Sequence, residues 1–350
     1  MQGYGVQSRT SSMEGIALHW SMRLVTMLLG IVFGVGSASP ALAQRFPFER
    51  SFDVTGPSAL DVSTIRGRIE VTAGEPGRIV IVGTATVRVD WNVPTNAADL
   101  ARKVANNPPI QREGHTVRLR PPSDPAEQRA VTVSYEVRVP PETDVTTASE
   151  SGATTVRGVA RAVVIRTQSG AVDAMQLGST AVVTSGSGSV TVDGIAGSLT
   201  ITTSSSSVTA RAVAGDLRVR TMSGAVNAAL SGEGNADVET GSSVIRLSGI
   251  RGAVIAATQS GRVSLQGVPR GDWSATTGSG SIDIATESSV PFTLDANSGS
   301  GSVKVIGASV QGSVAKRKVA GSIAGGGSLV KVSSRSGSVV VRLGGLLSTP

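Results

Sequence analysis

The sequence contains no cysteine and only two histidines, His19 and His115, and these shortages exclude several classes of chemistry. Without a thiol there is no disulfide, no thiolate metal ligand, no cysteine nucleophile and no N-terminal cysteine to carry a lipid. Aromatic residues make up 3% of the chain, so few side chains can stack on bases or sugars. We therefore expect no metal site, no cofactor and no specific nucleic-acid recognition.

Charged residues are also scarce, at 16% of the chain, whereas glycine is abundant, with 43 of 350 residues. Hydrophobic residues make up 39%, which is too many for a disordered chain. So much glycine disfavours long helices, while small residues together with valine and threonine favour strands joined by tight turns. The composition predicts an all-β protein.

A Ser/Gly turn followed by an apolar residue recurs at a nearly constant interval of about 18 residues, which indicates a repeat architecture. Examples are T-Q-S-G-A-V at 167–172 and T-M-S-G-A-V at 221–226. The closing apolar residue falls at positions 172, 190, 208, 226, 244, 263, 282 and 303. Each unit holds two short alternating segments, so the sequence predicts a β-solenoid or β-helix-like stack of two-strand coils. A three-sided hexapeptide helix has the same period, but apolar residues do not recur every six positions.

The N-terminus has the pattern of a secretory signal peptide. Arg23 precedes an apolar run from Leu24 to Val35, and the small-residue segment Ser37–Ala43 follows. We expect residues 1–43 to be a signal peptide with an upstream extension, the alternative being an uncleaved anchor helix. Cleavage after Ala43 leaves a mature chain with no transmembrane segment.

The remaining chain divides into three parts. Residues 44–143 are a β-rich region with one short helix at 96–106, and this region continues into the stack. Residues 144–343 form the β-repeat array, and 344–350 form a short tail. Asn107-Pro108-Pro109 ends the helix, which is an excursion from the sheet.

The repeat register predicts two structural features on the surface of the array. Arg218 and Arg220 lie one coil before Asp237 and Glu239 in the same positions, which predicts the cross-rung pairs Arg218–Asp237 and Arg220–Glu239. A ladder of turn hydroxyls is expected along the stack, formed by Thr184, Thr203, Thr221, Thr240 and Thr258.

The repeats contain no catalytic constellation. The outward position after the turn is acidic in two coils, where it is Asp173 and Asp283. These residues are six coils or about 29 Å apart and cannot share one substrate bond. Trp273 and Phe292 occupy apolar strand positions and are expected in the core rather than on a sugar-stacking platform. We expect no catalytic, cofactor-binding or metal-binding residues. An enzyme on this scaffold would need a groove with two carboxylates within about 10 Å.

The segment from Tyr135 to Val145, followed by repeated S-G-x-V-x-V units, resembles the bacterial "putative adhesin" β-strand-repeat family of unknown function. The resemblance spans about residues 50–343. It implies an extracytoplasmic β-solenoid-like domain with a surface or adhesive role, and it supplies no catalytic residues.

These observations favour an exported, non-enzymatic module of the cell envelope or surface, located in the periplasm, on the cell surface or outside the cell. Its partner would be an envelope component, a glycan or a protein. Two alternatives remain: a carbohydrate-active enzyme on a β-helix scaffold, and a periplasmic envelope-stress partner protein that binds through its N-terminal region.

Overall fold

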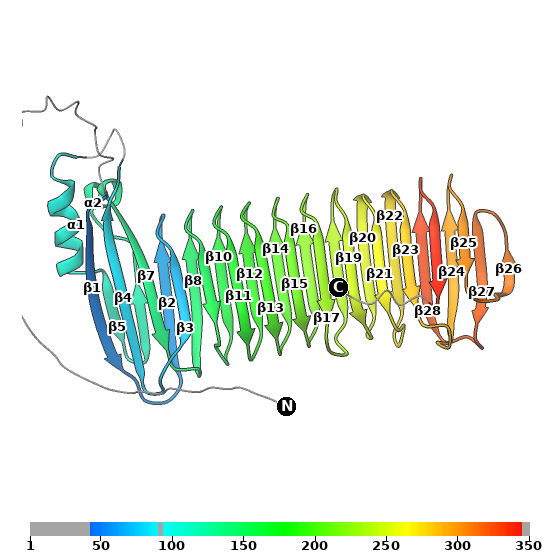
Figure 1. Ribbon diagram of the computed structural model, residues 1–350, viewed down its shortest axis with the longest axis horizontal. Coiled ribbons are helices and arrows are strands. Elements are labelled where there is room, and N and C mark those ends of the chain that lie inside the picture. The colour runs from blue at the N-terminus through cyan, green and yellow to red at the C-terminus, as the bar shows by residue number, and fades with distance from the viewer. Residues whose placement is uncertain (1–42, 90–93, 345–350) are drawn as a thin grey trace, which may run out of the picture. The chain divides into compact units, whose positions relative to one another are not determined.

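The structure is a computed structural model that describes residues 43–89 and 94–344. The predicted signal peptide, apart from Ala43, and the predicted tail, apart from Gly344, lie outside the described residues. The described residues form one compact unit. It consists of two sheets, sheet A with 14 described strands and sheet B with 15 (Figure 1).

Successive strands of the repeat array alternate between the two sheets, so that each sheet-B strand and the sheet-A strand after it form one coil. The sheet-B strands are β8 (Thr143–Ser149), β10 (Val163–Thr167), β12 (Ala181–Ser185), β14 (Leu199–Thr203), β16 (Leu217–Thr221), β18 (Ala236–Thr240), β20 (Val254–Ser260) and β22 (Trp273–Ser279). The sheet-A strands are β9 (Thr154–Arg157), β11 (Val172–Leu177), β13 (Val190–Ile195), β15 (Val208–Val213), β17 (Val226–Leu230), β19 (Ile245–Ile250), β21 (Val263–Gly267) and β23 (Ile282–Thr286).

Neighbouring strands in the array are parallel and lie one repeat apart in the sequence. Leu199 pairs with Leu217 of the next repeat, and Leu217 pairs with Ala236 of the repeat after that. The predicted all-β stack of two-strand coils is therefore confirmed. One predicted register position is wrong: Val226 pairs with Ile245 rather than Val244, because the segment from Val226 to Ala236 is one residue longer than the equivalent segment from Val208 to Leu217.

The core is a thin layer between the two sheets, filled by every second residue of each strand. Val183, Ile201 and Val219 of sheet B are at most 1% exposed, as are Val190 and Val208 of sheet A. Branched side chains suit this layer because they pack well on a pleated surface. Trp273 and Phe292 are also buried, and Trp273 Nε1 donates to the carbonyl oxygen of Gly252 at 3.1 Å. Neither ring can serve as a sugar platform.

At the N-terminal end, the order of the strands in space departs from their order in the chain. The strands are β1 (Arg45–Asp53), β2 (Ser58–Thr64), β3 (Ile69–Ala73), β4 (Arg78–Val87), β5 (Ile110–Glu113), β6 (Thr116–Leu119) and β7 (Val131–Val139). The β2–β3 coil lies directly against β8 and β9, and β6 and β7 lie outside it. Antiparallel β4 and β1 then extend sheet A, and antiparallel β5 ends sheet B.

The two helices of the described residues cover this end (Figure 1). Helix α1 (Ala97–Asn106), which the sequence predicts, packs against β1 and β4. The expectation of a single helix in this region is wrong, because a second helix, α2, spans Pro125–Ala130. The Asp124 side chain accepts a hydrogen bond from Ala126 N at 2.8 Å, and Pro125 fits the first turn.

The C-terminal end also departs from chain order. Its strands are β24 (Phe292–Ser298), β25 (Val303–Ile306), β26 (Gln311–Val314), β27 (Lys318–Ile323), β28 (Ser328–Ser334) and β29 (Val339–Leu343). The red β28–β29 coil, last in the sequence, lies between β22–β23 and the orange β24–β25 coil (Figure 1). Ile282 thus pairs with Val339, and Val339 pairs with Val303, so the predicted direct step from 282 to 303 is wrong. Antiparallel β27 and β26 continue sheet B beyond β24.

Most sheet-B strands of the stack carry a buried hydroxyl residue at or within two residues of their C-terminal end, which we call the corner hydroxyl. The corner hydroxyls are Thr64, Ser149, Thr167, Ser185, Thr203, Thr221, Thr240, Thr258, Thr277, Ser298 and Ser334. Four of the five predicted ladder residues belong to this column. Thr184 does not: it is exposed and pairs with Thr202, whereas Ser185 pairs with Thr203. Strand alternation makes Ser185 the inward residue and turns Thr184 to the outer face.

The corner hydroxyls make two kinds of hydrogen bond. Some accept a backbone N–H from the residue three positions later, as Thr167 Oγ1 accepts from Gly170 N at 2.9 Å. Some donate to a carbonyl of an adjacent coil, as Thr277 Oγ1 donates to Gly261 O at 3.0 Å, and Ser298 Oγ does both. These bonds satisfy polar groups that are buried at the edge of the core.

Glycine occupies most positions three residues after a corner hydroxyl, because neighbouring coils approach too closely there for a side chain. A Cβ atom on Gly188 would lie 1.9 Å from the carbonyl oxygen of Gly170, and one on Gly224 would lie 1.7 Å from that of Ser206. Atoms cannot approach this closely, so the spacing of the coils depends on these glycines.

We predict that Gly188→Ala lowers the free energy of unfolding by about 2 kcal/mol or more, because the added methyl forces two coils apart. Ser187→Ala is the matched control, since Ser187 is exposed in the same turn; its effect should stay within about 0.5 kcal/mol. Urea denaturation of the chain from Gln44 measures both. Equal unfolding midpoints for the two variants would contradict the close-approach argument.

Candidate binding groove on sheet B

An open groove of about 1110 Å³ crosses the outer face of sheet B beside the corners. It runs over successive coils from β10 to β22, which corresponds to about 29 Å at the usual strand spacing. A second hollow of about 420 Å³ continues it toward β2 and shares Thr167, Gln168 and Thr184 with the first. We call this continuous surface the sheet-B groove.

The lining of the groove repeats with the coils. One row comes from the last outward position of each sheet-B strand: Thr184, Thr202, Arg220, Glu239, Ala257 and Thr276. The other row comes from the first residue after each corner hydroxyl: Gln168, Gly186, Ser204, Met222, Gly241 and Gln259. Hydroxyls and amides both donate and accept hydrogen bonds. Each coil of the groove therefore offers at least one polar side chain to an extended molecule, with the apolar side chains of Met222 and Ala257 among them.

The predicted charged residues meet in the middle of this face. Arg218 Nε lies 3.4 Å from Asp237 Oδ2, and Arg220 Nε lies 3.2 Å from Glu239 Oε2. A third contact, which the sequence did not indicate, joins Arg220 Nη2 to Asp237 Oδ2 at 2.6 Å. This hydrogen bond to Asp237 raises the pKa of Arg220. Arg220 therefore holds both carboxylates from one guanidinium.

The carboxylates of Asp237 and Glu239 lie within about 10 Å of each other, since both contact Arg220. Their placement is nevertheless unsuited to glycoside hydrolysis. Both side chains leave the same face of β18, two residues apart, and both are bound to arginine. Carboxylates that cleave a glycosidic bond flank it from two sides. Asp173 and Asp283, the other pair considered, lie six pairings apart on sheet A.

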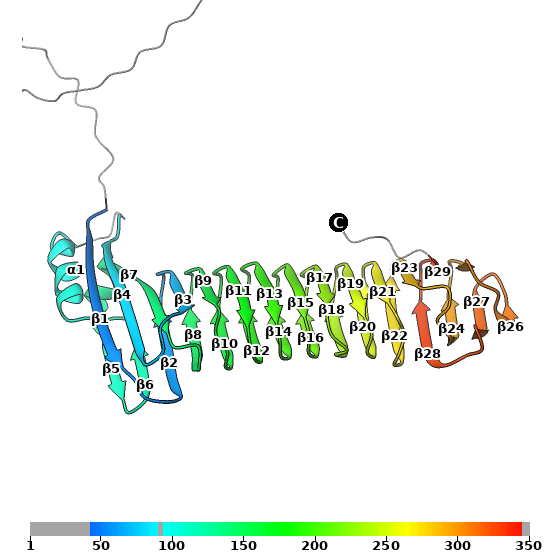
Figure 2. The same ribbon diagram turned by 60° about the horizontal axis from the view of Figure 1, so that its bottom comes forward.

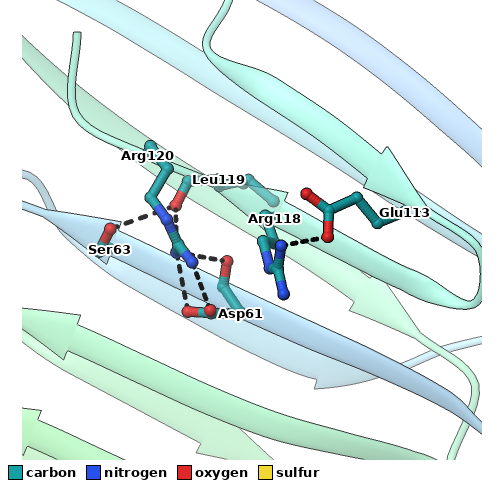
Figure 3. A network of polar contacts seen from close by, with 6 residues as sticks. All are labelled: Asp61, Ser63, Glu113, Arg118, Leu119 and Arg120. Carbon is teal, nitrogen blue, oxygen red and sulfur yellow. Dashed lines mark hydrogen bonds and ion pairs between the residues drawn. The ribbon is translucent and has the colours of Figure 1, made fainter. Parts of the chain in front are cut away.

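A second polar network lies on sheet B at the N-terminal end (Figure 3). Arg120 of the segment after β6 binds Asp61 of β2 with both terminal nitrogens, and Nη1 lies 2.8 Å from Oδ1. This bond raises the pKa of Arg120. Arg118 pairs with Glu113, and Ser63 Oγ donates to Leu119 O at 3.3 Å. The network ties β2, β5 and β6 together, so its role is to fix the end of the sheet.

The sheet-B side is also more apolar than the sheet-A side. Val182, Ile255 and Leu329 are 39%, 51% and 40% exposed on sheet B, and Met222 is 66% exposed on the groove wall. On the outer face of sheet A, the described strands expose one large apolar side chain to this degree, Ile306 at the C-terminal end. The groove, the charged cluster and most exposed apolar side chains thus share one face.

His115 is exposed next to Gly114. Across residues 43–89 and 94–344, His, Asp and Glu form no group of three that could hold a metal ion. None of the helices in the described part of the chain has the length and apolar character needed to cross a membrane.

The sequence profile of the family described as Toastrack DUF4097 matches residues 133–342. This span runs from β7 to β29 and contains most of the sheet-B groove. No curated protein sequence matches the chain.

Three solved structures are similar over most of their length. A "putative cell adhesion protein" from Clostridium sporogenes is 10% identical, with 85% of this chain and 99% of that chain covered and a TM-score of 0.19. A "putative adhesin" from Bacteroides fragilis is 12% identical, with 85% and 97% covered and a TM-score of 0.22. A "putative lipid binding protein" from Parabacteroides distasonis is 14% identical, with 84% and 96% covered and a TM-score of 0.27. Likenesses at these TM-scores carry no functional information.

We predict that Arg220→Gln lowers the free energy of unfolding by about 1 kcal/mol, because it removes the shared partner of two carboxylates. Arg218→Gln is the matched control: its side chain is 64% exposed and makes one longer contact, so the loss should stay below about 0.5 kcal/mol. Denaturant unfolding compares the two variants. Equal losses would show that Arg220 is not the centre of the cluster.

Proposed function

The chain belongs to the Toastrack DUF4097 family, and from this membership and its sheet-B surface we propose that it is an exported, non-enzymatic binding module of the bacterial cell envelope. The resemblance to an adhesin-like β-strand-repeat family of unknown function is confirmed. The pattern of residues 1–43 supports export to the periplasm, the cell surface or the exterior. The ligand we propose is an extended polar polymer, such as a glycan strand of the envelope.

The continuous sheet-B groove is the observation that carries this proposal. Each of its coils contributes at least one polar side chain, at a spacing of about 4.8 Å. A polymer with regularly spaced polar groups can therefore make a hydrogen bond on coil after coil. Many weak contacts in series then add up to useful affinity without any single deep pocket.

The ion-pair cluster around Arg220 places charged groups at fixed positions in the groove. Arg220 and Glu239 both line it, and their ion pair presents a donor group beside an acceptor group. Because Arg220 is fixed by Asp237 as well, its position is set before a ligand arrives. A preorganised polar group loses less entropy on binding than a free side chain.

The second candidate is a carbohydrate-active enzyme on the same scaffold, favoured by the nearness of Asp237 and Glu239. It is less well supported because the two carboxylates lie on one side of the groove and are bound by arginine. An enzyme of this kind would release products from the glycan that the protein binds. The double variant Asp237→Asn/Glu239→Gln would abolish that release, whereas a binding module has no release to lose.

A glycan and envelope-component array tests the proposed function with the chain from Gln44. We expect binding to an envelope polymer, and we expect Thr202→Trp to weaken it at least tenfold by filling the groove. Thr209→Trp is the matched control, because Thr209 takes an equivalent outward position on sheet A. Equal weakening by both variants, or a blank array, would overturn the assignment of the groove. Capture of one defined envelope protein instead would favour the stress-partner alternative.

A further inference from the structure

The whole net positive charge of the protein is carried by the part of the chain that follows Asp295. The chain has 32 basic and 25 acidic residues and a net charge of +7. After Asp295 the sequence contains no Asp or Glu, but it contains seven basic residues: Lys304, Lys316, Arg317, Lys318, Lys331, Arg335 and Arg342. The chain up to Asp295 is therefore neutral overall, and the charge is concentrated at one end.

Strand β25 and the β26–β27 hairpin lie at the outermost part of the C-terminal end (Figure 2), and they carry four of these cations. Lys304 is on β25, the edge of sheet A, and Lys316, Arg317 and Lys318 form the turn and first residue of the β26–β27 hairpin. All four are exposed. In the described part of the chain none of them has a carboxylate partner, whereas Arg342 is paired with Asp283 at 3.0 Å. Arg317 instead donates to the carbonyl oxygen of Gly299 at 3.1 Å, which fixes the turn.

Exposed apolar side chains accompany these charges. Val314, the last residue of β26, is 67% exposed and directly precedes the Ala315–Lys318 turn. Ile306, the last residue of β25, is 51% exposed. We call this end, formed by Lys304, Ile306, Val314 and Lys316–Lys318, the C-terminal tip.

Charge alone has an ordinary explanation, because lysines on an edge strand prevent other strands from pairing with it. That explanation does not account for Val314 and Ile306, which increase the risk of association when exposed at an edge. Apolar side chains among unpaired cations are suited to the surface of an anionic bilayer, which has a charged headgroup layer above an apolar layer. Cations contact the headgroups, and apolar side chains enter the boundary with the acyl chains.

We propose that the C-terminal tip docks the protein onto an anionic lipid bilayer. On sheet B, strands β28 and β24 lie between the groove, which ends at β22, and the β26–β27 hairpin of the tip, so docking leaves the groove free along the stack. This inference does not depend on the proposed ligand of the groove. In this proposal the positive charge of the protein serves to bind the membrane and not the polymer.

Vesicle flotation tests the proposal with the chain from Gln44. We expect binding to phosphatidylcholine vesicles that contain phosphatidylglycerol and no binding to phosphatidylcholine alone. Each cation near an anionic surface contributes on the order of fivefold, so Lys316→Gln/Arg317→Gln/Lys318→Gln should weaken binding by on the order of a hundredfold. The matched control Arg157→Gln/Arg211→Gln/Arg251→Gln removes three exposed arginines of the array and should have little effect.

The absence of cysteine allows a second, local measurement. An environment-sensitive fluorophore on Val314→Cys should shift to the blue when anionic vesicles are added, and the same label on Thr209→Cys should not. Equal losses for the two triple variants, or equal spectral shifts at the two sites, would overturn the proposal. Binding to polyphosphate without binding to vesicles would also overturn it and assign the tip to a soluble polyanion.

Discussion

The corner hydroxyl is the contact on which the rest of the structure depends. Such hydroxyls accept a hydrogen bond from their own turn, as Thr167 does, or donate one to an adjacent coil, as Thr277 does, and they do so at the buried edge of the core. The glycine three residues later has no room for a side chain. Neighbouring coils can therefore approach in one register only, and a slip by one residue would turn the apolar side chains outward. The sheet-B groove beside the corners exists because this register is fixed.

Much of the stack could be predicted from the sequence, because the nearly constant period of the repeats aligns side chains on adjacent coils. The same alignment places Arg218 beside Asp237 and Arg220 beside Glu239, which the structure shows in contact. Arg220 and Asp237 occupy different positions of the repeat, so aligning the repeat sequences does not predict their contact. The predicted ladder misplaces Thr184 by one residue because Thr184 and Ser185 both carry a hydroxyl, and only the alternation of the strand decides which faces inward.

The two ends could not be predicted, because the order of coils in space is not the order in the chain. The last coil has a corner hydroxyl, Ser334, and a following glycine, Gly337, as most other coils do. It can therefore stack between two coils that precede it in the chain. In the same way β6 lies beside β2, and this pairing brings Arg120 to Asp61 across 59 residues of sequence. No local signal marks such partners. Register decides which coils stack. Antiparallel strands then extend the sheets at both ends of the stack, and the two helices of the described residues cover the N-terminal end.

The central claim, that register rather than chain order decides stacking, can be tested by disulfide trapping in the cysteine-free chain. Thr276 of β22 pairs with Ser333 of β28, whereas Asn297 of β24 lies one strand further away. Adjacent strands are about 4.8 Å apart, within the range of a disulfide, and a separation of two strands is outside it. We predict that an intramolecular disulfide forms rapidly in Thr276→Cys/Ser333→Cys and does not form in Thr276→Cys/Asn297→Cys. The reverse result would show that the coils stack in chain order and would contradict the account.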